Sequence, residues 1–203
     1  MSRTFIAVVG EEQKDFMLHT AVASRSSNFF HAAMNNDWRE SRQRRITLLE
    51  IDPPDFEHYL QWLSTHDHSF LDDTSFHQLA KLYILGDFLA DSAFRVDMLK
   101  RFTAKAVTQN AYADLDVAII VWEQTPEHSP LRKMIVETWI TSSIARLAEQ
   151  FASADEEAPK AFVVDCLRRI SEMQPRAKDS VTGYKRRLVL EARRDEVLKE
   201  LVA

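Results

Sequence analysis

Glycine is scarce in this chain: its 203 residues contain three, Gly10, Gly86 and Gly183. They lie far apart, so no glycine-rich loop is present to wrap a phosphate group. The P-loop, Rossmann and kinase classes of nucleotide-binding protein are therefore excluded. A low glycine content also favours helices joined by short connections.

Cysteine and long apolar segments are scarce as well. Cys166 is the single cysteine, so no disulfide forms within the chain, and this fits a reducing compartment. Apolar runs such as 117–122 are far shorter than the roughly 20 residues of a membrane-spanning helix. The N-terminus leads directly into a strand-like segment and does not resemble a signal peptide. We expect the protein in the cytoplasm or the nucleus.

The charge balance is mildly acidic. The net charge is −5 and the sequence pI is about 5.8, which does not favour a protein that binds nucleic acid or acidic membranes with its whole surface. Apolar residues make up 45% of the chain, as in ordinary globular proteins, and the length allows one domain or two small ones.

Three short strands are predicted near the N-terminus. Residues 4–9 (TFIAVV) are rich in β-branched and apolar side chains, and a charged turn after Gly10 leads to a second strand at 15–18, which together indicate a hairpin. Residues 45–49 (RITLL) predict a third strand. Between them, small residues at 21–26 and bulky residues at 29–34 recur at helical spacing.

Helices account for the remainder. We expect one to begin at Asp52-Pro53, with Asp52 as its cap, a second to be capped by Thr74 or Ser75, and a third by Asp91 or Ser92. A change in composition near 108–112 suggests a domain boundary. Beyond it we expect four further helices, beginning near 114, at Ser129-Pro130, at Pro159 and after Gly183.

The most informative segment is 16–41, FMLHTAVASRSSNFFHAAMNNDWRES. Its spacing of F-x-L-H, S-x-F-F and W-x-E resembles the BTB/POZ domain, and so does the helix L-x-x-L-Y-x-L-G-D at 79–87. The segment TPEHSPLRK at 125–133 is similar to one that often follows this domain in fungal proteins. The residues that carry the first likeness are His19, Val22, Ser27, Phe29, Phe30, Ala33, Trp38 and Glu40.

The resemblance implies an α+β fold: a BTB/POZ domain over 1–110, with a small sheet of about three strands and a cluster of helices, followed by an all-α extension over 111–203. It implies a protein–protein interaction module that forms homodimers, or heterodimers with another BTB protein, and has no catalytic residue, metal or cofactor. Within the family, many members are substrate adaptors of cullin-3 ubiquitin ligases. No small-molecule substrate or membrane is expected.

The resemblance also implies two surfaces. The self-association surface would include Phe5, Ala7, Ala21, Val22, Arg25 and Ser26. The cullin-facing surface would include Trp62, Phe70, Leu71, Asp72, Tyr83 and Asp87. Two positions depart from the family's pattern. Thr4 stands where an aspartate often precedes the first strand, and Phe70-Leu71-Asp72 replaces an apolar-x-Glu pattern common in cullin-binding members.

Three other features of the sequence have residue types that other functions use. The C-terminal segment is basic, which would suit a nuclear transcription or chromatin factor; its cations are Lys185, Arg186, Arg187, Arg193 and Arg194. Opposite charges four residues apart favour instead a solvated helix face.

The His66-Asp67-His68 segment has the residue types of a metal site, but a solvated polar loop is favoured. Cys166 is expected to be a core thiol, and no nucleophile and base are placed for an enzyme.

Overall fold

The structure is a computed structural model that describes residues 4–35, 42–65, 67–109, 111–141 and 158–173. The chain divides into two compact units, Met1–Thr74 with Lys81–Met98, and Ser75–Ala80 with Leu99–Ala203. Helices α5 (Phe76–Phe88) and α6 (Ser92–Thr108) each contribute residues to both units. Trp38 and Glu40 of the W-x-E motif, His66 and the basic segment 185–194 lie outside the described residues.

The first unit contains a three-stranded sheet of order β2-β1-β3. Strands β1 (Thr4–Val9) and β2 (Lys14–His19) are antiparallel, with Thr4 opposite His19 and Val9 opposite Lys14, and this confirms the predicted hairpin. The third predicted strand is also confirmed: it is β3 (Arg45–Leu48), which pairs in parallel with β1. Gly10 supplies the positive φ of 75° that the hairpin turn requires.

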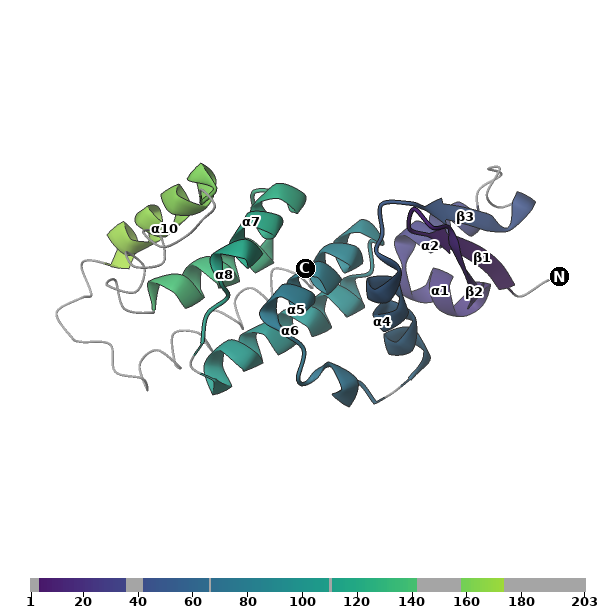
Figure 1. Cartoon of the computed structure of the whole chain (residues 1–203), viewed down its shortest axis with the longest axis horizontal. Coiled ribbons are helices and arrows are strands. Elements are labelled where there is room, and N and C mark those ends of the chain that lie inside the picture. Colours follow the sequence, from purple (N-terminus) through teal and green to yellow (C-terminus); the bar gives the residue numbers. More distant parts are fainter. Residues whose placement is uncertain (1–3, 36–41, 66, 110, 142–157, 174–203) are drawn as a thin grey trace. The chain divides into compact units, whose positions relative to one another are not determined.

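Two short helices follow the hairpin, α1 (Thr20–Ser26) and α2 (Asn28–Asn35), beside the strands (Figure 1). The serine of the S-x-F-F motif has a clear structural role. The Ser27 hydroxyl accepts a hydrogen bond of 3.1 Å from the Phe30 amide and donates one of 2.6 Å to the Leu89 carbonyl. It therefore caps α2 and fixes it to the end of α5, while Phe30 enters the core.

Helix α4 (Pro53–Ser64) begins with its prolines in the first turn, as predicted. The expectation that the Asp52 side chain caps it was wrong. Asp52 holds the N-cap position but makes no side-chain cap bond, because its carboxylate pairs instead with Lys81 at 2.9 Å. Lys81 also lies 3.0 Å from Asp55, so this cation joins α5 to both acidic residues at the start of α4.

Helices α5 and α6 approach closely at Gly86. A Cβ atom there would lie 3.0 Å from Phe94 Cδ1 and 3.3 Å from the Arg95 amide nitrogen, which confirms that this glycine permits a neighbouring helix to come near. The two predicted caps are also confirmed. The Ser75 hydroxyl accepts from the Gln78 amide at 3.1 Å, and the Asp91 carboxylate accepts from the Phe94 amide at 3.0 Å.

An aromatic core fills the first unit. The ring centre of Phe30 lies 5.3 Å from that of Phe5 and 6.5 Å from those of Phe56 and Tyr59. The Tyr59 ring packs edge-on against Phe94, with the two ring centres 5.0 Å apart. One carboxylate is buried among these rings.

That carboxylate belongs to Asp91, which is fully buried. It accepts hydrogen bonds from the Ser26 hydroxyl of α1 and, at 2.9 Å, from the Tyr59 hydroxyl of α4, in addition to the Phe94 amide of α6. Burial, and secondly the Asp91 charge, raise the pKa of the Tyr59 hydroxyl. Tyr59 therefore stays a donor at all physiological pH values. Asp91 thus connects three helices through one side chain.

The second unit is helical, with α7 (Leu115–Gln124), α8 (Pro130–Ile140) and α10 (Lys160–Met173). These confirm three of the helices predicted beyond residue 110. The ring of Phe162 lies 4.8 Å from Trp122 and 5.1 Å from Trp139, so one residue of α10 packs against both α7 and α8. The boundary between residues 110 and 111 itself stays a prediction.

The T-P-x-x-S-P-L-R segment forms the turn between α7 and α8. The buried Arg132 reaches back over this turn and donates to the Trp122 carbonyl at 2.7 Å, to the Thr125 carbonyl, and to the Thr125 hydroxyl at 3.0 Å. Its guanidinium also lies 5.2 Å from the Trp122 ring centre. These bonds satisfy carbonyls at the end of α7 that have no partner within the helix.

We expect Arg132→Met to lower the free energy of unfolding by about 2–3 kcal/mol, because it leaves buried carbonyls without donors. Urea unfolding followed by circular dichroism measures this change. Arg168→Met is the matched control, since Arg168 is exposed and its partner among the described residues is Asp165, at 3.2 Å. Its effect should stay below about 0.5 kcal/mol. Equal effects of the two substitutions would contradict this role for Arg132.

Asp91→Ala should lower the free energy of unfolding by about 3 kcal/mol or more, because the buried Tyr59 hydroxyl, the partly buried Ser26 hydroxyl and the Phe94 amide lose their acceptor together. The same unfolding experiment tests it. Asp15→Ala removes an exposed carboxylate that pairs with Arg45 at 2.8 Å and should cost less than about 1 kcal/mol. A cost of under about 1 kcal/mol for Asp91→Ala would show that this carboxylate does not organise the helices.

Candidate protein interaction surfaces

Exposed apolar side chains occur on α1 and on the strand β2 that precedes it. We call Met17, Ala21, Val22 and Arg25 the α1 surface. Met17 is 73% exposed and Val22 36%, and Ala21 and Arg25 are exposed as well. Ala21 and Val22 lie four and three residues before Arg25, so the three share one helix face. The small side chain of Ala21 permits another backbone to approach closely.

The remaining predicted members of this surface lie elsewhere. Phe5 and Ala7 are buried in β1, the central strand of the sheet, so their side chains belong to the core. The expectation that Phe5 contributes exposed apolar area is therefore wrong. Alternation in β1 places these residues on the covered face of the sheet. Ser26 is partly buried and donates to Asp91, so it holds α1 in position instead of offering a free hydroxyl.

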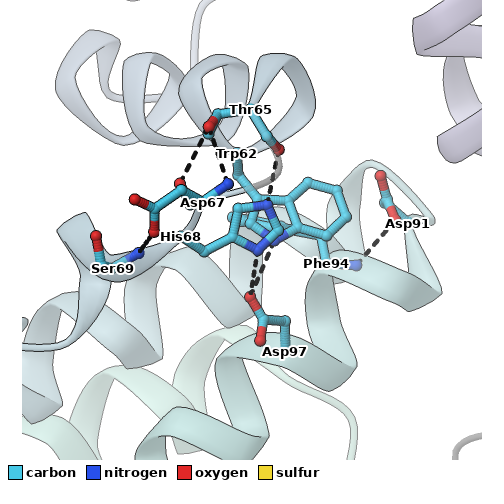
Figure 2. Close-up of polar contacts among 8 residues, drawn as sticks. All are labelled: Trp62, Thr65, Asp67, His68, Ser69, Asp91, Phe94 and Asp97. Atoms are coloured by element: carbon cyan, nitrogen blue, oxygen red, sulfur yellow. Dashed lines mark hydrogen bonds and ion pairs between the residues drawn. The ribbon is translucent and has the colours of Figure 1, made fainter.

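A second group of side chains gathers where α4 ends (Figure 2). The Trp62 indole donates a hydrogen bond of 2.9 Å to Asp97 Oδ2, and His68 Nδ1 lies 3.4 Å from the same oxygen. Figure 2 shows the His68 ring over the indole, with ring centres 5.3 Å apart. His68 Nε2 lies 3.0 Å from the Thr65 carbonyl. Asp97 thus fixes an aromatic pair that is partly exposed.

The connection after α4 is ordered by hydrogen bonds to its own backbone. The Asp67 carboxylate accepts from the Ser69 amide at 2.9 Å, and this bond is the main cause that lowers the pKa of the Asp67 carboxyl. The Thr65 hydroxyl accepts from the Asp67 amide at 3.0 Å. A short 3₁₀ helix, η1 (Ser69–Leu71), follows where the sequence predicted a polar loop.

The structure separates the six predicted cullin-facing residues into two groups. Trp62, Phe70 and Asp87 are partly exposed and Asp72 is exposed, so these side chains reach the surface. Leu71 and Tyr83 are each 1% exposed, so their placement on a surface was wrong. Leu71 turns inward from η1, and Tyr83 lies on the buried side of α5 next to Leu82. Asp87 pairs with Arg95 of α6.

Sequence reasoning missed Asp97 entirely and identified Asp91 only as a helix start. Asp91 was recognised from a local signal, an acidic residue immediately before an apolar helical repeat. The hydrogen bonds that Asp91 accepts from Ser26 and Tyr59 cannot be predicted from such a pattern, because both residues lie far away in the sequence. Asp97 and Trp62 are 35 positions apart in the sequence, so no local pattern indicates their hydrogen bond.

No catalytic arrangement emerges among the described residues. Cys166 is buried, as predicted, and burial, followed by the Asp165 charge, raises the pKa of its thiol to about 12, so it is not a thiolate near neutral pH. Within the described ranges, no group of three or more His, Cys, Asp or Glu side chains could hold a metal ion. In the same ranges, every helix is too short or too polar to cross a bilayer.

A sequence model of the BTB/POZ domain matches residues 4–109, just over half of the chain. The matched span covers the sheet, the Ser27 cap, the Asp91 core and both groups of surface residues. Among the curated proteins, none matches this chain. The observed order of hairpin, two short helices, third strand and helical cluster agrees with the family match, and a helical extension follows it. The chain belongs to the BTB/POZ family, and its N-terminal domain is a protein interaction module.

Proposed function

We propose that this protein self-associates through the α1 surface. The observation that carries the proposal is the exposed face of Ala21, Val22 and Arg25 on α1, and the preceding strand β2 adds Met17, which is 73% exposed. Scattered exposed apolar residues are ordinary, whereas a continuous group on a small-residue helix supports a protein contact. A twofold dimer would place two copies of this surface together.

The packing of α1 supports this use. Its inner residue Ala23 is 1% exposed, Ser26 donates to Asp91, and the neighbouring Ser27 donates to the Leu89 carbonyl. The helix is therefore fixed in position before any partner arrives. A surface that is already ordered loses little conformational entropy on association, which favours binding by a helix of only seven residues.

Ala21→Arg should dissociate the dimer, because a long cationic side chain then stands at the centre of the contact beside Arg25. Light scattering after gel filtration should change from twice the chain's 23.5 kDa to that mass. Ala104→Arg, at an exposed position of α6, is the control and should leave the dimer intact. A monomeric wild-type protein at high micromolar concentration, or an Ala21→Arg variant that stays dimeric, would contradict the proposal.

A second candidate function is that of an adaptor for a cullin-3 ubiquitin ligase. It is favoured by the partly exposed Trp62 and Phe70 and the exposed Asp72, which come from α4, η1 and the position directly after η1. Aromatic side chains held in position are the usual centres of binding energy in protein contacts. Asp97 holds Trp62 in this way, and the His58 ring stacks on Phe70 at 6.3 Å.

If this second function is correct, Phe70→Ala should weaken binding to the N-terminal domain of cullin-3 at least about tenfold by calorimetry. Thr47→Ala, exposed on β3, should leave the affinity unchanged. Absence of binding by the wild-type protein would reject the adaptor function and leave self-association untouched. The chromatin-factor alternative and the cellular compartment stay predictions, since the basic segment lies outside the described residues.

A further inference from the structure

Strand β2 forms an open edge of the three-stranded sheet. It pairs with β1 on one side, and among the described residues no strand lies on its other side. Its residues stay in unbroken register with β1, without a bulge, and they include no proline. Such an edge offers main-chain donors and acceptors to another strand, and proteins usually shorten, bend or cover an edge that has no partner.

The register shows which peptide groups of β2 face outward. The Ile6 amide donates to the Arg44 carbonyl at 2.9 Å, on the β3 side, so the peptide groups of Ile6 are directed away from β2. Directly opposite residues of an antiparallel pair alternate between those that exchange hydrogen bonds and those that do not, and Met17, opposite Ile6, belongs to the second kind. The amide and carbonyl of Met17 are therefore directed away from β1. The pattern repeats every two residues, so the same holds for Asp15.

The side chains along this edge are complementary to a second copy of themselves. Asp15, Met17 and His19 are exposed and lie on one face of the sheet, because side chains alternate along a strand. Asp15 and His19 each stand two residues from Met17, one on either side. In an antiparallel pairing of two β2 strands with Met17 opposite Met17, each Asp15 faces the His19 of the other copy.

This register is electrostatically favoured. A carboxylate and an imidazole directly opposite each other stabilise a strand pair, whereas a pairing centred on Asp15 would bring two carboxylates together. The Asp15 carboxylate is already oriented by Arg45, at 2.8 Å, and its side chain is still 51% exposed. It is therefore accessible to a second cationic or donor group.

We propose that two copies of this chain pair their β2 strands antiparallel about Met17, which joins their two sheets into one of six strands. The inference rests on the proposed self-association and specifies how the second copy is seated, because Met17 belongs to the α1 surface and α1 begins directly after β2. The peptide groups of Met17 bond to those of its counterpart. The two Met17 side chains pack together between the two Asp15–His19 pairs.

Disulfide cross-linking tests this register. Directly opposite Cα atoms of a hydrogen-bonded antiparallel pair are about 5.5 Å apart, which a disulfide can bridge. Met17→Cys should therefore form a dimer of twice 23.5 kDa on a non-reducing gel after mild oxidation. Asp15→Cys is the matched control, because the two positions would lie about 13 Å apart and should cross-link at least about tenfold more slowly. Adding Ala21→Arg to Met17→Cys should remove the cross-link.

A charge exchange tests the side-chain pairs. His19→Asp places two carboxylates opposite each other at both ends of the pairing and should weaken dimerisation about tenfold, measured by light scattering over a concentration series. Asp15→His/His19→Asp exchanges the two residues and restores the opposite pairs, so its Kd should return to within about threefold of the wild-type value. Both variants share the change at position 19, so any effect on the start of α1 is common to them.

The outcomes separate this inference from the function on which it rests. Equal cross-linking of Met17→Cys and Asp15→Cys, in a chain that light scattering shows to be dimeric, would overturn the strand pairing and leave self-association through the α1 surface intact. An exchange variant that dimerises no better than His19→Asp would also overturn it. A monomeric wild-type protein would instead reject the proposed function itself.

Discussion

The carboxylate of Asp91 is the contact on which the N-terminal unit depends. It receives the Ser26 hydroxyl from α1, the Tyr59 hydroxyl from α4 and the Phe94 amide from α6, all at a position closed to solvent. A buried carboxylate is stable only when such donors surround it. Any other placement of α1 and α4 would leave this group with the Phe94 amide as its remaining donor of the three. The charge therefore selects one arrangement of three helices, and the aromatic rings pack around that arrangement.

This arrangement determines which side chains remain outside. With Ser26 and Ala23 directed inward, the opposite face of α1 presents Ala21, Val22 and Arg25. A comparable constraint acts at the other end of α4, where Asp97 holds Trp62 close to His68. In both places a carboxylate whose long-range hydrogen bonds no sequence pattern reveals positions a surface on which the proposed functions rely. Membership of the BTB/POZ family explains the fold, whereas these contacts explain the particular surfaces of this chain.

Local signals predicted most elements correctly. The β-branched and apolar run at 4–9, the Ser75 and Asp91 caps and the prolines at the start of α4 and α8 act within a few residues, and the structure contains each of these elements. Side-chain direction was less predictable. Phe5, Ala7, Leu71 and Tyr83 were placed on surfaces by resemblance, yet strand β1 is central and η1 turns Leu71 inward. Burial at these positions depends on neighbours far away in sequence, as does the capture of Asp52 by Lys81.

Amide hydrogen exchange measured at low and high protein concentration tests most directly whether this domain functions through its exposed surfaces. The account predicts that amides of residues 17–25 exchange more slowly as the concentration rises, because a second copy then covers α1. Amides of α10, which is not part of this contact, should be unaffected. Exchange in α1 that is independent of concentration, together with protection that appears elsewhere in the chain, would contradict the account.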